Sequence, residues 1–365
     1  MKIAYDAKRF FQNSSGLGNY SRDLIRILSG HYPENKYLLL NTKKTKKGKE
    51  ILEKQNVFFH SIPDSKLSRQ LKMGKEAQDS GADIFHGLSG ELPLKWNKKP
   101  IKKIVTVHDL IFLRFPQFYS FFDKEIHLWK FKKAAKKSDR IIAISEQTKK
   151  DIVHYLKVPE NKIEVIYQGC HEAFKNEIPE QTLSMISEKY SLPHRFILNV
   201  GTIEERKNLH RVVQALKGTG IPLVVVGKKT KYFKKVKKAA EKGKVETYFL
   251  EKVSMEDLAV IYRLADIFIY PSLFEGFGIP VIEALYSSTP VITSNRSSLP
   301  EAGGEDSVYV DPENIEDINS KILFLWNNEA ERKRRAEKGL KYVQKFNDDQ
   351  IAQQINSLYQ KILKK

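Results

Sequence analysis

The feature that most constrains the fold of this chain is an alternation of short apolar runs with segments of helical period. The runs are rich in Val and Ile and almost continuously apolar, which is typical of strands buried on both faces of a parallel sheet with helical crossovers. They form two series along the chain. The first is KIAYD (2–6), KYLLL (36–40), ADIFH (82–86), KKIVTVH (102–108), DRIIAIS (139–145) and KIEVIY (162–167), and the second is RFILNVG (195–201), IPLVVVG (221–227), VETYFL (245–250), ADIFIYP (265–271), TPVITS (289–294) and SVYV (307–310).

The two series predict two domains. At 365 residues the chain is longer than a single core usually reaches, and the polar residues 171–193 between the series lack strand character. We therefore expect an α/β protein with two doubly wound, Rossmann-like domains, over residues 1–175 and 190–346. Sheets of this kind bind ligands beyond the carboxyl ends of their strands, so functional residues are expected where a strand passes into a loop.

Composition narrows the class of protein. The single cysteine, Cys170, excludes a disulfide framework within the chain, no apolar run approaches the roughly 20 residues that span a bilayer, and MKIAYDAKRF lacks the apolar region of a signal peptide. These features predict a soluble, cytoplasmic protein. The formal net charge of +19 favours anionic partners, namely nucleic acid, an anionic membrane face or phosphate-bearing substrates, and a lysine-rich solvated surface explains it equally well.

The stretch FEGFGIPVIEA (274–284) has the composition of a ligand-binding loop that opens a helix. It follows a predicted strand, and Pro280 suits the first helical turn, where its missing N–H costs nothing. Gly276 and Gly278 allow backbone geometries that a side chain would block. The loop therefore presents a helix amino terminus with open N–H groups, which suits a phosphate or a sugar hydroxyl.

Two glutamates flank this loop. Glu275 precedes the predicted helix, and Glu283 lies about one turn inside it. Because carboxylates would repel a bound phosphate, the pair is suited to accepting hydrogen bonds from the hydroxyl groups of a sugar or ribose. Stabilisation of a helix dipole by two acidic residues explains the pair equally well.

A second group of candidates follows the first strand of the second series. In GTIEERKNLHRVVQAL (201–216), Arg206 and Lys207 stand just ahead of a helix whose apolar stripe includes Leu209 and Val212. Two cations are unfavourable at a helix amino terminus without an anion to offset them, so this pair suits a diphosphate. The alternative is a solvated surface pair.

Three weaker signals lie in the first series. NSSGLGNYSRDLIRIL (13–28) carries Gly16 and Gly18 between a strand and a helix, where they form either a simple turn or a ligand-binding loop. His108 ends a strand, where it is either a satisfied structural histidine or a group that contacts a sugar hydroxyl or polarises a reacting group. Ser145 ends another strand and has the position of a helix cap.

Taken in order, these motifs resemble those of the group 1 retaining glycosyltransferases, nucleotide-sugar enzymes of the GT-B architecture. The most specific motif is the E-x7-E spacing in EGFGIPVIE, supported by GLG, VHD, ISE and RKN along the chain. The resemblance covers essentially the whole chain. It implies a GT-B fold whose two domains face each other across a cleft, with a C-terminal helix at about 347–365 that returns to the first domain.

The resemblance also implies a role for each matching residue. Glu283 is similar to the glutamate that holds the donor ribose, Glu275 to the one beside the anomeric carbon of the donor sugar, and Lys207 to the lysine that binds the diphosphate. Many members have an arginine where this chain has Thr202, and Arg206 is then the substitute. The implied catalytic residues are Glu275, His108, Arg206 and Lys207, and the implied donor-binding residues are Gly16, Gly18, Ser145, Arg206, Lys207, Gly276, Phe277, Gly278, Ile279, Val281 and Glu283.

The implied function is transfer of a hexose, with retention of anomeric configuration, from a nucleotide-diphosphate sugar to a hydroxyl of a glycan or lipid-linked acceptor in surface polysaccharide biosynthesis. Mannosyl- and rhamnosyl-type members are the most similar, which favours a GDP-mannose-type donor over a UDP- or TDP-sugar. The family requires no cofactor and no metal, and the sequence has no Asp-x-Asp metal signature near these motifs and no Cys/His cluster. Retention without an evident nucleophile implies attack from the face that the leaving group vacates, assisted by a phosphate oxygen.

The segment FPQFYSFFDKEIHLWKFKKAAKKSDR (115–140) combines aromatic residues with a lysine cluster in the domain that receives the acceptor in GT-B enzymes. It suits peripheral contact with the anionic inner face of a membrane, or a lipid-linked diphosphate acceptor, and a core helix with a solvated rim is the alternative. A second lysine cluster, residues 227–244, is expected to be a surface helix, and neither cluster has the spacing of a nucleic-acid motif. The aromatic residues of the segment include Phe118, Tyr119, Phe121, Phe122, Trp129 and Phe131.

Two other functions fit parts of the sequence. A nucleotide-sugar epimerase or a phosphorylase of the same fold would need acid–base carboxylates or a pyridoxal lysine that these motifs do not supply. A basic polyanion- or RNA-binding protein without enzymatic activity would bind nucleic acid in a strongly salt-dependent way and would not depend on Glu275.

Overall fold

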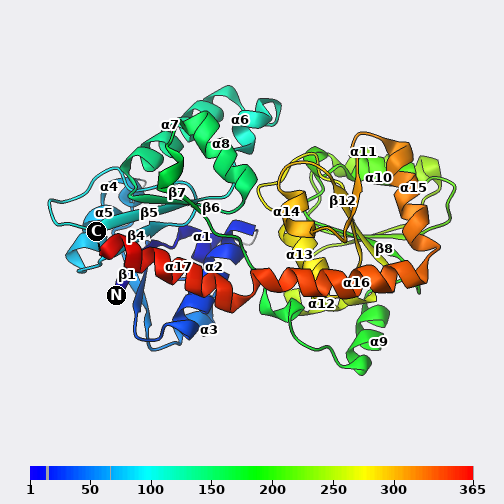
Figure 1. The fold of residues 1–365 in the computed structure, drawn as a ribbon, viewed down its shortest axis with the longest axis horizontal. Helices are drawn as coiled ribbons and strands as arrows, with labels where there is room; N and C mark the ends of the chain where they lie inside the picture. Colours follow the sequence, from blue (N-terminus) through cyan, green and yellow to red (C-terminus); the bar gives the residue numbers. More distant parts are fainter. Residues whose placement is uncertain (14–15, 66, 365) are drawn as a thin grey trace. The chain divides into compact units, whose positions relative to one another are not determined.

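The computed structural model describes residues 1–13, 16–65 and 67–364. The chain divides into two compact units, Met1–Gly169 with Phe346–Lys365 and Cys170–Lys345, here called the first and second units. Each unit is built around one parallel β-sheet with helices on both faces (Figure 1). The predicted α/β class with two doubly wound sheets is confirmed.

The first unit holds a seven-stranded sheet in the order β3-β2-β1-β4-β5-β6-β7, in which all paired strands are parallel. The strands are β1 (Lys2–Asp6), β2 (Lys36–Asn41), β3 (Val57–Ser61), β4 (Ile84–Gly87), β5 (Lys102–Val107), β6 (Arg140–Ala143) and β7 (Ile163–Val165). Every predicted run of the first series overlaps a strand. The edge strand β3 was missed because its faces are only half covered: Val57 is buried and Phe58 is exposed, so the run is not continuously apolar.

The second unit holds a six-stranded parallel sheet in the order β10-β9-β8-β11-β12-β13. Every predicted run of the second series contains one of its strands, with shorter bounds. The strands are β8 (Ile197–Val200), β9 (Leu223–Val226), β10 (Thr247–Leu250), β11 (Ile267–Tyr270), β12 (Val291–Ser294) and β13 (Val308–Val310).

The helices lie between the strands and cover the sheets. In the first unit they are α1 (Lys8–Gln12), α2 (Gly16–His31), α3 (Lys49–Leu52), α4 (Ser68–Leu71), α5 (Met73–Asp79), α6 (Ile111–Arg114), α7 (Phe121–Lys137), α8 (Glu146–Leu156) and α17 (Asp348–Leu363). In the second unit they are α9 (Glu180–Lys189), α10 (Leu209–Ala215), α11 (Phe233–Gly243), α12 (Met255–Leu264), α13 (Ile279–Tyr286), α14 (Leu299–Gly303), α15 (Ile315–Trp326) and α16 (Glu329–Val343). Short 3₁₀ helices span Pro116–Phe118, Glu160–Lys162, Glu172–Phe174, Glu205–Lys207 and Gln344–Phe346. None of the helices in the described residues has the length and apolarity needed to cross a bilayer.

In both sheets the strand order reverses beside the first strand of the unit. The chain builds outward from β1 to β3 and then continues on the other side with β4, and it repeats this pattern from β8 to β10 and then β11. Doubly wound sheets bind ligands at such switch points, beyond the carboxyl ends of the strands. The switch point of the second unit lies between β8 and β11, whose following loops carry Arg206, Lys207 and Glu275.

The chain passes between the units at Gly169–Cys170 and again at Lys345–Phe346. Residues 171–193, which we expected to form the junction, lie in the second unit and contain α9. This helix is fastened to α12 by an ion pair of 2.6 Å between Lys189 and Asp257. The polar composition of the segment therefore reflects a surface helix rather than a linker.

The last helix, α17, joins the first unit through a buried polar network. The Tyr359 hydroxyl lies 2.7 Å from Nδ1 of His86 and 3.2 Å from the hydroxyl of Tyr5. Nε2 of His86 lies 2.8 Å from Oγ1 of Thr106, which lies 3.1 Å from the hydroxyl of Tyr20. All five side chains are buried, and burial lowers the pKa of His86 to about 3, so its ring is neutral. The network ties α17 to β1, α2, β4 and β5.

We predict that Tyr359→Phe destabilises the first unit by about 1–3 kcal/mol, because it leaves the buried Nδ1 of His86 without its hydrogen-bond partner. Thermal and urea unfolding of the variant should show the loss, and Tyr119→Phe, which alters an exposed ring, should behave as wild type. Equal unfolding midpoints for wild type and Tyr359→Phe would contradict the role given to the network.

Candidate active site

The candidate active site of the second unit centres on the Glu275 carboxylate, in the loop after β11. Its Oε1 accepts hydrogen bonds of 2.8 Å from the hydroxyls of Tyr270 and Ser272 and lies 2.8 Å from Nη1 of Arg206. Burial alone would raise the pKa of this carboxyl, but Arg206 and Lys207 outweigh it and lower the pKa to about 2. Glu275 is therefore ionised at any physiological pH, and all the hydrogen bonds that described residues make to its carboxylate reach one oxygen.

Serines at the start of α14 fix the loop that carries Glu275. The Glu275 N–H donates to Oγ of Ser297 at 3.0 Å. Oγ of Ser298 donates to the carbonyl oxygens of Glu275 and Phe277, at 2.9 and 2.8 Å. Because both ends of this short loop are bonded to the same turn, the carboxylate is held in place before any ligand arrives.

The two cations of the RKN motif play different parts. The guanidinium of Arg206 is occupied within the protein, since it bonds to Glu275, to Glu204 at 2.6 Å and to the carbonyl oxygen of Phe274. Nζ of Lys207 donates to the Tyr270 hydroxyl at 2.8 Å, which is its one hydrogen bond to the described residues. An ammonium group has three donors, so Lys207 keeps N–H groups for an anion. Burial lowers the pKa of Lys207, with Glu275 acting against that effect.

The absence of a side chain at Gly201 leaves space for the Lys207 side chain. The backbone of Gly201 has φ of +136°, and a Cβ there would lie 2.5 Å from Nζ of Lys207. A larger residue would displace the ammonium from the end of β8. The glycine of the predicted strand-to-loop transition is thus required by the lysine that follows it.

The pKa of Glu283, inside α13, is shifted in the opposite direction to that of Glu275. It is 6% exposed, and its Oε2 accepts a hydrogen bond of 3.0 Å from the Tyr262 hydroxyl. Burial raises the pKa of Glu283 to about 7, against the effects of Tyr262 and Lys207. Near neutral pH this carboxyl therefore exchanges between a protonated donor and an ionised acceptor.

The amino terminus of α13 offers backbone donors to a ligand. Gly278 caps the helix with φ of +129°, and a Cβ there would lie 3.0 Å from the Leu299 side chain. The N–H of Ile279 has no hydrogen-bond partner among the described residues. The Val281 N–H, however, donates to the carbonyl oxygen of Gly278 at 2.9 Å, and the side chains of Phe277 and Val281 are buried. Of the predicted loop contacts, Ile279 fits an anion or hydroxyl best, and Val281 packs the core.

His108 in the first unit is a fully bonded histidine. The side-chain amide of Gln168 donates to Nδ1 of His108 at 3.0 Å. Nε2 of His108 lies 2.9 Å from the carbonyl oxygen of Leu88 and therefore carries the proton that it donates to this oxygen. Burial lowers the pKa of His108 to about 4. Both ring nitrogens are occupied in a neutral ring, so this geometry favours the structural interpretation over a proton-transfer role.

Ser145 is also a structural residue in this geometry. Its hydroxyl is buried, accepts from the Thr148 N–H at 3.0 Å and so caps α8. Oγ1 of Thr148 donates to the carbonyl oxygen of His108 at 3.1 Å, which fastens the start of α8 to the end of β5. Because the Ser145 side chain is buried, it exposes no group for the predicted contact with the donor.

The two glycines of the GLG motif differ. A Cβ on Gly18 would lie 2.1 Å from the carbonyl oxygen of Asn13, so close packing requires glycine there. Arg22 holds the same turn by donating to the carbonyl oxygens of Phe10 and Asn13, at 2.9 and 3.0 Å. A Cβ on Gly16 would meet none of the described residues within 4 Å, so packing against them does not explain that glycine.

Sequence reasoning missed the hydroxyl groups that organise the site. Tyr270 bridges Lys207 and Glu275, and Tyr262 bonds Glu283. Tyr270 is the next-to-last residue of the predicted strand ADIFIYP, so its place near a carboxyl end was a signal, but an aromatic residue in a strand is ordinarily a core residue. The partners of Tyr262 come from a different helix and have no sequence signature.

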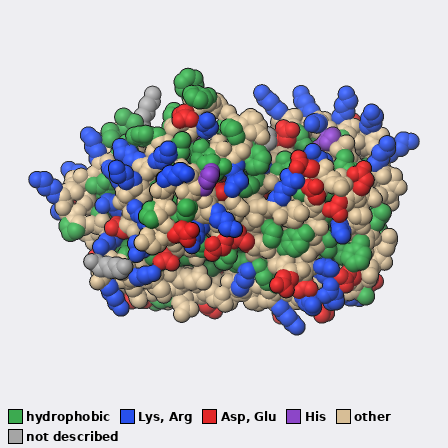
Figure 2. Space-filling view, turned by 45° about the horizontal axis from the view of Figure 1, so that its top comes forward, with side chains coloured by type: hydrophobic (Ala, Val, Ile, Leu, Met, Phe, Trp, Pro, Cys, Tyr) green, Lys and Arg blue, Asp and Glu red, His purple; other side chains and the backbone are tan. Residues whose placement is uncertain are grey.

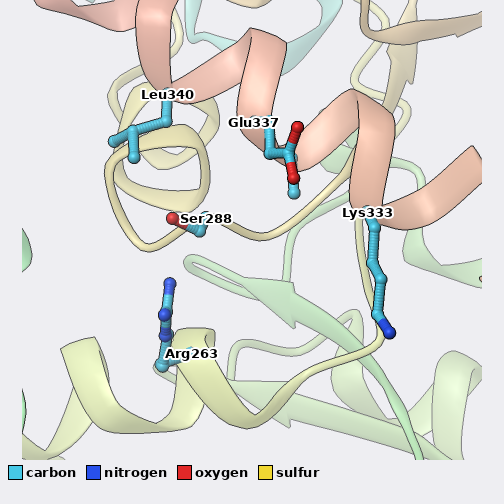
Figure 3. A pocket seen from close by; sticks show the side chains of 6 residues that line it. Arg263, Ser288, Lys333, Glu337 and Leu340 are labelled. Carbon is cyan, nitrogen blue, oxygen red and sulfur yellow. The ribbon is translucent and has the colours of Figure 1, made fainter. Parts of the chain in front are cut away.

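The second unit also has a pocket of about 290 Å³ on α12, α16 and the turn after α13, where Arg263 points toward Ser288 (Figure 3). None of the predicted site residues lines it. Its lining residues are Arg263, Ser288, Lys333, Ala336, Glu337 and Leu340. Within the described residues, no group of three or more His, Cys, Asp or Glu side chains is arranged to hold a metal ion.

Family comparisons agree with this arrangement. Residues 186–342, which contain the whole second-unit site, match the model of the group 1 glycosyl transferases, and residues 15–174 match that of glycosyltransferase family 4. Both models describe glycosyltransferases, and together they span most of the chain, so the chain is a glycosyltransferase. Arg206, Lys207, Glu275 and Glu283 all lie within the residues that match the group 1 model.

Named relatives of this glycosyltransferase include bacterial mannosyltransferases. The O-antigen chain mannosyltransferase B of Escherichia coli is 26% identical over 290 residues, which are 76% of this chain and 74% of that protein. The serotype-specific mannosyltransferase WbdA of Escherichia coli is 27% identical over 263 residues, 67% of this chain but 32% of that protein, so the matched part spans about a third of that relative.

Solved structures share the GT-B fold of this glycosyltransferase. A glycosyltransferase from Rickettsia africae ESF-5 superposes with a TM-score of 0.77 at 19% identity, covering 100% of this chain and 98% of that one. Anabaena Alr3699/HepE, crystallised in complex with UDP and glucose, gives 0.78 at 16% identity, covering 99% and 100%. At these identities the likeness establishes the fold alone.

We predict that Glu283→Gln stabilises the second unit above neutral pH. The folded-state pKa of Glu283 is about 7, above the ordinary value of 4.5, so the wild type loses stability as pH rises from 4.5 to 7, by on the order of 3 kcal/mol. The glutamine variant has no such loss. Thermal unfolding at pH 5 and pH 8 should show a higher melting temperature for the variant at pH 8 only.

Glu256→Gln, which changes an exposed carboxyl on α12, is the matched control and should follow the wild type at both pH values. A Glu283→Gln variant that melts below the wild type at pH 8 would contradict the burial of an uncompensated carboxyl at this position.

Proposed function

We propose that this glycosyltransferase moves a hexose, with retention of anomeric configuration, from a nucleotide-diphosphate sugar to a hydroxyl of a glycan or lipid-linked acceptor in surface polysaccharide biosynthesis. The observation that carries the proposal is the Arg206–Glu275–Tyr270–Lys207 cluster beside the amino terminus of α13. A GDP-mannose-type donor is favoured, because relatives of this chain are named mannosyltransferases, and UDP- and TDP-sugars are the alternatives.

The cluster has the donors that a departing diphosphate needs. Lys207 supplies an ammonium with N–H groups to spare, and the unpaired N–H of Ile279 supplies a backbone donor at a helix amino terminus. Such fixed donors stabilise charge as it develops on a leaving group, because they need no reorganisation during the reaction. The proposed chemistry assigns this stabilisation to the protein's own groups, with no metal or cofactor.

The two glutamates then hold the rest of the donor. Glu283, inside α13, accepts hydrogen bonds from the ribose, and this role requires its ionised form. Glu275 offers its second oxygen to a hydroxyl of the donor sugar, since Oε1 is taken by protein donors. A ribose that bonds to the Glu283 carboxylate lowers the pKa of that group, so donor binding strengthens as pH rises through about 7.

The state of Glu275 favours front-face retention over a covalent intermediate. A carboxylate with a pKa of about 2 and three hydrogen-bond donors on one oxygen is a weak nucleophile. The proposed step therefore has the acceptor hydroxyl attack C1 from the side that the diphosphate leaves, and a diphosphate oxygen takes the hydroxyl proton. A sugar trapped covalently on Glu275 would overturn this step.

The proposed site of action is the cytoplasm, including peripheral contact with the inner face of a membrane that carries a lipid-linked acceptor. The net charge of +19 and the exposed lysine-rich surface support contact with anionic partners. No specific nucleic acid is part of the proposal.

The first test is metal-free calorimetric titration with GDP, UDP, TDP and ADP. One nucleotide should bind, and Lys207→Ala should weaken that binding on the order of tenfold or more, because a charge-assisted hydrogen bond to phosphate is lost. Lys341→Ala, an exposed lysine of α16, is the control and should bind like the wild type. Failure to bind any of these nucleotides, with tight and salt-sensitive RNA binding instead, would replace the proposal with the polyanion-binding function.

A further inference from the structure

Large hydrophobic side chains are exposed on one helix of the first unit. Half of those exposed in the described part of the chain lie between Tyr119 and Trp129. Phe121 is 68% exposed, Phe122 78%, Ile126 53% and Trp129 51%. Single exposed hydrophobic residues are ordinary, whereas a cluster of this size on one element marks an interaction surface.

The fold does not need these side chains, because another face of α7 is already packed. Ala134 and Ala135 are buried in the core, and Leu128 and Phe131 pack against it. The Phe131 ring lies 5.4 Å from that of Phe112, a buried core residue. The helix therefore has one apolar face for the core and a second with no partner among the described residues.

The second face is continuous along the helix. Phe122, Ile126 and Trp129 are spaced by four and three residues, so their side chains share one stripe, and Phe121 extends it at the start of α7. We define these four residues as the outer face of α7. The aromatic side chains have the size that an interfacial anchor requires.

Lysines border the outer face. The helix FFDKEIHLWKFKKAAKK carries six lysines against Asp123 and Glu125. Nζ of Lys133 lies over the Trp129 ring at 4.6 Å, and Nζ of Lys124 lies 5.3 Å from the centre of the Phe121 ring. Figure 2 shows Lys and Arg side chains over much of the visible surface, with hydrophobic side chains gathered at its top. Aromatic anchors beside lysines are complementary to an anionic lipid surface.

We infer that the outer face of α7 docks on an anionic lipid bilayer. The aromatic rings enter the boundary between headgroups and acyl chains, and Lys132, Lys133 and Lys136 lie among the lipid phosphates. A second copy of the chain is the less suitable occupant, because two helices with this excess of lysine repel each other. The charge balance thus selects the membrane over self-association.

Ion pairs connect α7 to the edge of the same sheet at which the carboxyl end of β1 lies. Nζ of Lys130 on α7 lies 3.5 Å from the carboxylate of Glu91. Arg69 joins Glu91, at 2.8 Å, to Asp6 at the carboxyl end of β1, at 2.6 Å. Docking through α7 would therefore hold this edge of the first sheet against the bilayer. That the docked edge receives a lipid-linked acceptor rests on the proposed function, whereas the docking itself does not.

Vesicle co-sedimentation tests the inference without any substrate. The wild type should bind vesicles of phosphatidylcholine with phosphatidylglycerol much better than vesicles of phosphatidylcholine alone. Phe122→Ser with Trp129→Ser should lower that binding on the order of tenfold or more, because both anchors are lost. Phe324→Ser, an exposed ring of α15 in the second unit, is the control and should leave binding unchanged.

Lysine variants separate a docking face from general attraction to charge. Lys132, Lys133 and Lys136 changed to Gln should weaken vesicle binding, whereas Lys234, Lys235 and Lys238 of α11, changed in the same way, should not. The α11 variant removes the same number of positive charges. Among the described residues, α11 has no exposed large hydrophobic side chain. Equal losses for the two sets, or binding that survives the loss of Phe122 and Trp129, would overturn the inference.

Two further readouts complete the test. Sedimentation velocity of the wild type and the Phe122→Ser/Trp129→Ser variant should give the same oligomeric state, and a wild-type dimer that the variant disperses would assign the outer face to a second copy instead. Nucleotide titration of the same variant should match the wild type. Loss of vesicle binding with nucleotide binding intact supports docking through α7, while vesicle binding without nucleotide binding would remove the proposed function and leave the docking inference standing.

Discussion

The site depends on the contact between Arg206 and Glu275, because a buried carboxylate is stable only when cations and hydrogen bonds offset its desolvation. The contact joins the loops after β8 and β11, on the two sides of the strand-order reversal. Tyr270 adds a second bridge, since its hydroxyl bonds both Glu275 and Lys207. The polar centre is therefore assembled by the protein itself, and it leaves one oxygen of Glu275 and part of the Lys207 ammonium for substrate.

The two glutamates of the E-x7-E motif are made unlike by their surroundings. Two cations hold Glu275 ionised, with a pKa of about 2, whereas Glu283 has one tyrosine hydroxyl as a close partner and a pKa of about 7. Glu283 thus reduces stability in the absence of a ligand, and such a cost is common where a buried polar group is kept for binding. In the proposed function, the permanent charge of Glu275 acts beside the reacting carbon and the titratable Glu283 binds the ribose.

Much of the fold could be predicted from the sequence because strands buried on both faces read as continuous apolar runs. The edge strand β3 could not, since Val57 is buried but Phe58 is exposed, and the residues after them are at most partly buried. The motifs placed Glu275 and Lys207 correctly at the carboxyl ends of strands, where the topology brings them together. The partners of His108 were not predictable, because Gln168 lies 60 residues away and reaches it only in the folded unit. That contact favours the structural interpretation of His108, one of the two that the sequence left open.

The measurement that most directly tests the role of Glu275 is a comparison of nucleotide affinity and turnover in Glu275→Gln, using the donor whose nucleotide binds. Nucleotide affinity should stay within about threefold of the wild type, while turnover should fall on the order of 10² or more, because the charge acts at the sugar rather than at the diphosphate. Glu204→Gln removes the other carboxylate bonded to Arg206 and should leave both quantities near the wild type. Equal losses of affinity and turnover in Glu275→Gln, or undiminished turnover, would contradict the account.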